Sequence, residues 1–162
     1  MDDIVSFLQT VSICSVLIDT EREVLASRFK DVHFKAGDTI ISEGDTSQNL
    51  YIIRSGFVDI TRGPKDKRIF LTTLGEGEYF GEASLFHGIK RTANVDARED
   101  VHLLMIDRRT FDEYLSAYPN AANRILYQML KQIFLRLSQT SHELQFERKG
   151  SLDQSSVDKL LT

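Results

Sequence analysis

The chain has 162 residues and a formal net charge of −4, with 41% hydrophobic and 27% charged residues. This composition is typical of one soluble globular domain with an appendage, and it excludes a disordered chain and a second full domain. The chain lacks both the excess of lysine and arginine that binds nucleic acid and an apolar run of roughly 20 residues that spans a bilayer, so we expect no direct DNA binding and no membrane association.

The amino-terminal region shows apolar residues at helical spacing from Ile4 to Phe29. Residues Asp19 to Glu21 have the side chains of a helix start, which can bond the free amides of a first turn. We therefore expect short helices to fill a first segment, residues 1–30.

The pattern changes between Val32 and Ile106, where short β-branched and aromatic runs are separated by glycine turns. Many short strands at regular spacing indicate a small barrel or sandwich, which we place at residues 31–107. The predicted strands are Thr39–Ile41, Leu50–Ile53, Phe57–Thr61, Ile69–Leu74 and Val101–Ile106.

Helical spacing returns at Arg108, first in a short hinge helix to Ala117 and then, after Pro119, in a long helix to about Phe146. These two helices form a predicted segment of residues 108–146, followed by a flexible tail at residues 147–162.

Within the long helix, apolar residues from Leu126 to Leu144 alternate spacings of four and three, which is the seam of a coiled coil. The stripe either packs on the strands of its own chain or forms a homodimer. The expected length of the helix favours self-association.

The stretch from Phe80 to Val95 carries the chemistry. Gly81 allows close backbone approach, Glu82 to Phe86 can form one helical turn with free amides, and Arg91 adds a fixed cation. Together these features predict a pocket for an anion.

The pattern Phe-Gly-Glu-x-x-Leu, a short loop, then Arg-x-Ala and a strand resembles the phosphate-binding cassette of the cyclic-nucleotide-binding domain family, of the catabolite activator and protein kinase A regulatory subunit type. The likeness extends upstream to Gly37–Ile40, Glu43–Asp45 and Leu50–Gly56, and covers roughly Val11 to Phe146. It implies an α+β, mainly β fold: an antiparallel double-stranded β-roll (jelly roll) with N-terminal helices, a short cassette helix and a long C-terminal helix.

By position, the resemblance implies that Arg91 pairs with the phosphate of cAMP or cGMP and that Glu82 holds the ribose 2′-hydroxyl. Amides around the following residues complete the cradle: Gly81, Ala83, Ser84, Thr92 and Ala93. Contacts to the base should come from the long helix, where Gln132 and Arg136 are candidates.

Four positions depart from the family pattern or leave it open. Lys90 and Asn94 are mild departures from a proline and from a threonine or serine. Gln48 matters more, because many members have an aspartate there that orients the phosphate arginine, and a neutral amide holds Arg91 more weakly. Thr92 leaves the choice between cAMP and cGMP open.

The predicted function is a sensor of cAMP or cGMP, in which binding shifts Leu85 and Phe86 against the hinge helix, moves the long helix and regulates an unknown downstream protein. The alternative is a ligand-free, degenerate β-roll that acts as a dimeric scaffold for protein interactions. No nucleophile elbow or metal-ligand cluster is visible, so we expect no enzyme, no metal and no cofactor. The single cysteine, Cys14, and the acidic amino terminus favour a cytoplasmic location.

Overall fold

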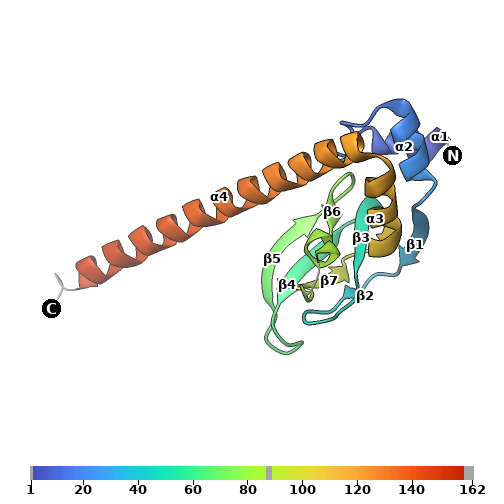
Figure 1. Cartoon of the computed structure of the whole chain (residues 1–162). Coiled ribbons are helices and arrows are strands. Elements are labelled where there is room, and N and C mark those ends of the chain that lie inside the picture. The colour runs from blue at the N-terminus through green and yellow to red at the C-terminus, as the bar shows by residue number, and fades with distance from the viewer. Residues whose placement is uncertain (1, 87–88, 159–162) are drawn as a thin grey trace. The chain divides into compact units, whose positions relative to one another are not determined.

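The computed structural model of the chain describes the backbone of residues 2–86 and 89–158, and the side chains of residues 3–86 and 89–138 (Figure 1). It comprises two compact units, Met1–Ile125 and Leu126–Thr162. The elements in chain order are α1 Asp2–Leu8, α2 Asp19–Ala26, β1 Lys30–Phe34, β2 Thr39–Ile41, β3 Asn49–Ser55, β4 Val58–Arg62, β5 Ile69–Leu74, β6 Tyr79–Phe80, the 3₁₀ turn η1 Glu82–Leu85, β7 Asn94–Ala97, β8 Val101–Asp107, α3 Arg108–Ala117 and α4 Pro119–Asp158.

The strands of the first unit form two four-stranded antiparallel sheets, in the orders β1-β8-β3-β6 and β2-β7-β4-β5. Apart from the β4–β5 hairpin, consecutive strands lie in different sheets, so the chain rolls up between the two sheets. The predicted antiparallel β-roll flanked by helices is confirmed.

The core between the sheets is built from alternate residues of the strands, because successive side chains of a strand point to opposite faces. It contains Tyr51 and Ile53 of β3, Val58 of β4, Val95 of β7 and Leu103 of β8, all buried. Burial of these large apolar side chains is the main stabilisation of the roll.

The opposite face of the β3 and β8 pair is equally buried, since Leu50, Ile52, Leu104 and Ile106 are at most 1% exposed. Helix α3 contacts β8 and lies beside this sheet (Figure 1). The central residues of both strands, Leu50–Ile53 and Leu103–Ile106, are apolar without alternation because both faces of the pair are covered there.

The N-terminal helices join the end of the roll through polar contacts of Glu21 on α2. Tyr114 of α3 donates from its hydroxyl to the Glu21 carbonyl at 3.1 Å, and Arg124 at the start of α4 forms an ion pair with the Glu21 carboxylate. Glu21 of α2 therefore holds both α3 and the first turns of α4.

Helix α3 begins directly where β8 ends, at Asp107. The Asp107 carboxylate accepts hydrogen bonds from the backbone N–H of Thr110 at 3.0 Å and from its hydroxyl at 3.1 Å. This N-cap satisfies an amide that the first turn leaves free and explains the abrupt change from strand to helix.

Helix α4 continues past Phe146, the predicted end of the long helix, to Asp158, so the backbone of residues 147–158 is helical. The flexible tail expected at residues 147–162 stays a prediction. After Pro119 the chain has no further proline to stop a helix, and Gly150 alone opposes it by only about 1 kcal/mol. Residues 159–162 lie outside the described part, and the boundaries at 30/31 and 107/108 stay predictions.

Within the described residues, no helix combines the length and the hydropathy that a membrane crossing requires.

Candidate functional site

The cassette begins where β6 ends at Phe80 and the backbone turns through Gly81. Gly81 has φ +85°, a left-handed conformation that residues with a side chain adopt at a cost. A Cβ atom at Gly81 would also lie 2.6 Å from the Asn49 carbonyl oxygen and 2.7 Å from Arg91 Nη1. Position 81 therefore requires glycine for two reasons, the left-handed turn and the close approach of Arg91.

The Arg91 side chain is buried, with the residue only 5% exposed, and its guanidinium is held by four hydrogen bonds. Nε donates to the Ser47 hydroxyl at 3.1 Å, and Nη2 donates to the Asn49 carbonyl at 3.0 Å. Nη1 donates to the Gly81 carbonyl at 3.1 Å and to the Ser84 hydroxyl at 2.7 Å. The cassette and the start of β3 thus hold the arginine from two sides.

All four acceptors are neutral, and in the part of the chain that the structure describes no carboxylate lies within ion-pair distance of Arg91. Burial lowers the pKa of the Arg91 guanidinium, while Tyr51, Asp45 and Glu82 act in the opposite direction. Arginine nevertheless stays charged in proteins. The site therefore contains a desolvated positive charge without a direct counterion, an arrangement that favours binding of an anion.

The other predicted ligand residues follow the cassette backbone. Glu82 and Ala83 are half-buried at the start of η1, and Ser84 is buried, with its hydroxyl donating to the Gly81 carbonyl at 2.8 Å. Thr92 is exposed and Ala93 half-buried, directly after Arg91. The structure brings Gly81, Ser84 and Arg91 into contact, and the ligand roles of all these residues stay predictions.

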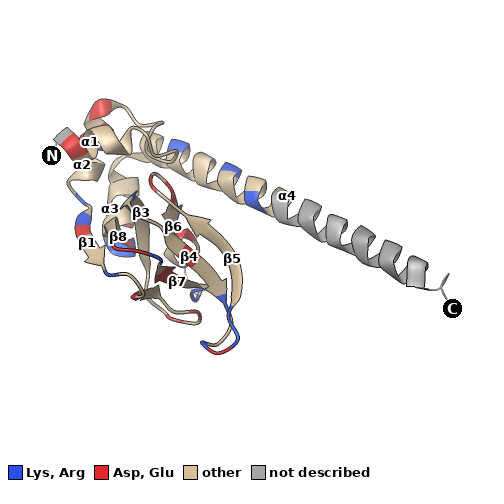
Figure 2. Cartoon of the chain, turned by 180° about the vertical axis from the view of Figure 1, so that it is seen from behind, with Lys and Arg blue, Asp and Glu red and all other residues tan. Residues whose placement is uncertain are grey.

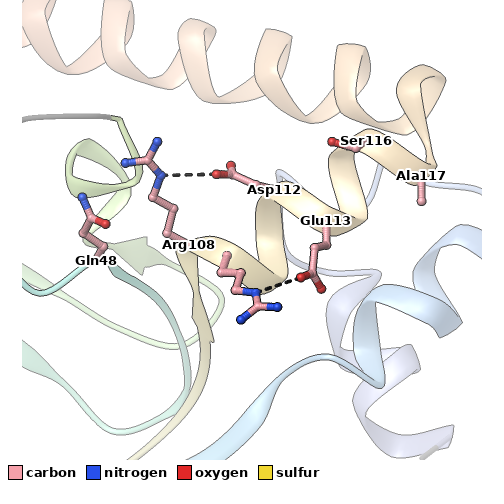
Figure 3. A pocket seen from close by; sticks show the side chains of 7 residues that line it. Gln48, Arg108, Asp112, Glu113, Ser116 and Ala117 are labelled. Carbon is pink, nitrogen blue, oxygen red and sulfur yellow. Dashed lines mark hydrogen bonds and ion pairs between the residues drawn. The ribbon is translucent and has the colours of Figure 1, made fainter.

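Gln48 does not orient Arg91. Its side chain lines an open hollow beside α3, together with Arg108, Asp112 and Glu113 (Figure 3). In this hollow Arg108 Nε donates to Asp112 at 3.2 Å, and Arg109 Nε donates to Glu113 at 3.0 Å. We expected the Gln48 amide to hold the phosphate arginine weakly. Instead, its two neighbours, Ser47 and Asn49, accept the hydrogen bonds of Arg91.

Sequence reasoning missed two residues that contact Arg91, Ser47 and Asn49, and gave Asn94 no role in the site. Asn94 is buried and joins two loops, since its Oδ1 accepts from the Glu43 N–H at 2.9 Å and its Nδ2 donates to the Gly63 carbonyl at 3.1 Å. The departure of Asn94 from the family pattern was the one available signal. Ser47 and Asn49 gave none, because Asn49 contributes only its backbone carbonyl and Ser47 a common hydroxyl.

The candidate base contacts, Gln132 and Arg136, both lie on α4 within the second unit and are half-buried there. Their role stays a prediction. Among the described residues no three His, Cys, Asp or Glu side chains lie close enough together to hold a metal ion.

A family model described as the cyclic nucleotide-binding domain matches residues 31–118, more than half of the chain. The chain belongs to the cyclic nucleotide-binding domain family. The matched residues include all the strands except the first residue of β1, and the whole cassette, and they end one residue beyond α3.

Relatives and solved structures of this family are similar over most of the chain. The cAMP-dependent protein kinase regulatory subunit of Debaryomyces hansenii is 34% identical over 109 residues, 67% of this chain and 24% of that protein. The cGMP-dependent protein kinase 2 of Mus musculus is 33% identical over 132 residues, 74% of this chain and 17% of that protein. The structure of the Thermus thermophilus catabolite activator protein superposes with a TM-score of 0.67 at 30% identity, covering 80% of this chain and 63% of that one. The chain spans at most about a quarter of the two kinase proteins.

Proposed function

We propose that this chain binds a cyclic nucleotide, cAMP or cGMP, at the cassette and passes the signal to a downstream protein through its C-terminal helices. The supporting observation is the buried Arg91, whose four partners are all neutral. A cyclic phosphodiester has one negative charge, which matches the guanidinium charge that has no direct counterion among the described residues. Relatives named for cAMP and for cGMP are about equally similar, so both nucleotides belong to the proposal.

In this proposal Arg91 pairs with the phosphate and the amides of η1 complete the cradle, with Gly81 leaving room for the close approach. Glu82 accepts a hydrogen bond from the ribose 2′-hydroxyl. Gln132 and Arg136 are the candidate contacts to the base.

In this proposal, the effect of ligand binding at Arg91 reaches the hinge helix α3 through the β2–β3 connection. Ser47 and Asn49 bond Arg91, and the carbonyl of Gln48 between them accepts from the backbone N–H of Arg108, the first residue of α3, at 2.8 Å. A ligand that shifts Arg91 therefore acts on residues that also hold the start of α3. A second proposed link between ligand and hinge helix is the packing of Leu85, which is buried. Phe86 is 46% exposed and therefore contributes less to such packing.

The long helix α4 is the proposed output, as a lid over the ligand or as the arm of a dimer. Its apolar residues Leu126 and Leu130 are 40% and 51% exposed, and exposed apolar side chains on one helix are typical of an interaction surface. A ligand moves this helix only by binding one of its arrangements more tightly than the other. A cytoplasmic site of action, favoured by the single buried cysteine, completes the proposal.

The test is calorimetric titration of the full chain with cAMP and with cGMP. We expect Arg91→Ala to lose ~2 to 4 kcal/mol of binding free energy, the range for truncating one partner of a buried, hydrogen-bonded charge pair. Arg98→Ala is the matched control, because Arg98 is 57% exposed and pairs only loosely with Asp59, at 3.6 Å. Equal affinity of the wild type and Arg91→Ala, with both folded by circular dichroism, would contradict the proposed site.

A second candidate function is a ligand-free scaffold that dimerises through the stripe from Leu126 to Leu144. It is favoured by one observation, that Arg91 already has four partners inside the protein. A cyclic nucleotide in large excess raises the melting temperature of a true receptor by mass action and leaves that of a scaffold unchanged. Sedimentation of the wild type and of Leu130→Asp tests the dimer separately, since a charge in the seam breaks it.

A further inference from the structure

The position that orients the phosphate arginine in many family members is Gln48 here, and its side chain lies in the hollow beside α3. A different side chain is bonded to Arg91 from the same loop. Ser47, half-buried at the end of the β2–β3 connection, places its hydroxyl oxygen 3.1 Å from Arg91 Nε. Among the described residues, Ser47 is the acceptor for this N–H.

We propose that Ser47 is a positioning residue for Arg91 and that it fixes the plane in which the guanidinium meets the phosphate. This inference rests on the proposed function. A guanidinium has five N–H donors, and described residues of the chain accept from four of them, which leaves one on Nη2 for an incoming oxygen. The direction of that remaining donor depends on the rotation of the plane, and Ser47 holds the plane at its Nε edge.

The other three contacts cannot be varied independently. The carbonyls of Asn49 and Gly81 belong to the backbone, so no substitution removes them. The Ser84 hydroxyl bonds both Arg91 and the Gly81 carbonyl, and its loss changes η1 itself. Ser47 is therefore the side chain through which the orientation of Arg91 can be tested.

A hydroxyl also differs from a carboxylate in what it does to the charge. Ser47 accepts a hydrogen bond without adding a negative charge, so the guanidinium is oriented but not neutralised. Its full charge then remains available to a phosphate, in a buried site where such attraction is stronger than in water. The Ser47 contact therefore orients Arg91 without weakening the attraction between its guanidinium and an anion.

The experiment compares Ser47→Ala, the conservative Ser47→Thr and the matched control Thr46→Ala in the full chain. Thr46 is the exposed neighbour of Ser47 on the same loop, and its bond to Asp45 uses the backbone N–H. We expect Ser47→Ala to bind cAMP or cGMP about three- to tenfold more weakly, the size of one lost hydrogen bond. Ser47→Thr and Thr46→Ala should stay within about twofold of the wild type.

A second readout follows the contact without any ligand. The ¹Hε–¹⁵Nε NMR signal of Arg91 should exchange slowly with solvent in the wild type, Ser47→Thr and Thr46→Ala, and faster in Ser47→Ala, because only there does Nε lose its acceptor. A general loosening of the fold would instead lower the melting temperature and speed exchange of the Arg91 backbone amide as well.

Unchanged affinity in Ser47→Ala overturns the inference, whether or not the Nε exchange rate changes. Equal Nε exchange in wild type and Ser47→Ala overturns it too, since the contact then does not hold Arg91 in solution. If the wild type binds neither nucleotide, the proposed function fails instead, and the Nε exchange rate alone decides whether Ser47 positions the side chain.

Discussion

Substitution of Gly81 by alanine tests the geometry of the cassette. Gly81 has φ +85°, where a Cβ atom is strained by about 1 to 2 kcal/mol. The added methyl group would also meet the Asn49 carbonyl oxygen at 2.6 Å and Arg91 Nη1 at 2.7 Å. Both contacts are shorter than van der Waals distance, and the carbonyl belongs to a paired strand that cannot move away easily.

The expected loss of unfolding free energy is the sum of backbone strain and overpacking, and a control variant separates the two. Overpacking against a fixed neighbour costs about 1 to 3 kcal/mol, so Gly81→Ala should lose about 2 to 5 kcal/mol of unfolding free energy. Gly77→Ala is matched in backbone, at φ +80°, but its Cβ atom would meet nothing within 4 Å. The control should therefore lose only the strain, about 1 to 2 kcal/mol.

Urea denaturation of both variants measures the loss of stability, and calorimetry measures the affinity for cAMP and cGMP. Because the methyl group displaces Arg91 Nη1 from the Gly81 carbonyl, affinity should fall at least about tenfold in Gly81→Ala, equivalent to ~1.4 kcal/mol, and stay near the wild-type value in Gly77→Ala. If the two variants lose equal stability and both keep the affinity, the close approach of Gly81 to Arg91 has no role in the site.

Three further predictions concern the framework. Asp107→Ala should lose about 1 kcal/mol of unfolding free energy in urea at pH 7, because it removes the cap on α3. The hydrogen bonds from Thr110 lower the pKa of Asp107 in the folded protein. The stabilisation by this carboxylate is therefore fully present above the unfolded pKa near 3.9 and is lost as the pH falls through the lower folded pKa. Tyr114→Phe should lose about 1 kcal/mol in the same assay, since a buried bond to the Glu21 carbonyl disappears. Burial raises the pKa of Cys14 to about 12, so a thiol reagent at pH 8 should label the folded protein at a negligible rate and the protein in urea rapidly.

Much of the fold could be predicted from the sequence because local signals agree with one another. The run at Ile69–Leu74 became β5 with the predicted bounds, and Asp19 and Arg108 begin helices where the apolar spacing changes. Gly81 and Arg91 of the predicted cassette are in contact, since the loop returns the arginine to the glycine carbonyl, although their ligand roles stay predictions. These are features in which a residue type has a direct backbone consequence.

The rest of the site depends on contacts that leave no such mark. Ser47 and Asn49 lie 44 and 42 residues before Arg91, and what Asn49 contributes is a carbonyl that every residue has. The two-residue strand β6 is too short for an apolar pattern, although it places Gly81 beside Asn49. Such contacts are set by how the sheets pack, and a single sequence does not contain that information.

The first unit offers an internal comparison that separates a binding arginine from a structural one. Arg22 of α2 is as buried as Arg91, at 4% against 5% exposed, and it too bonds backbone carbonyls, those of Cys14 and Leu17. Arg22, however, also pairs with the Asp19 carboxylate at 2.9 Å, which neutralises its charge within the fold. Arg91 has only neutral partners among the described residues, so its buried charge is balanced less well than that of Arg22. Because an anion gains most where the protein supplies no negative charge of its own, burial together with this imbalance, and not burial alone, is the reason why we propose Arg91 as the phosphate-binding residue.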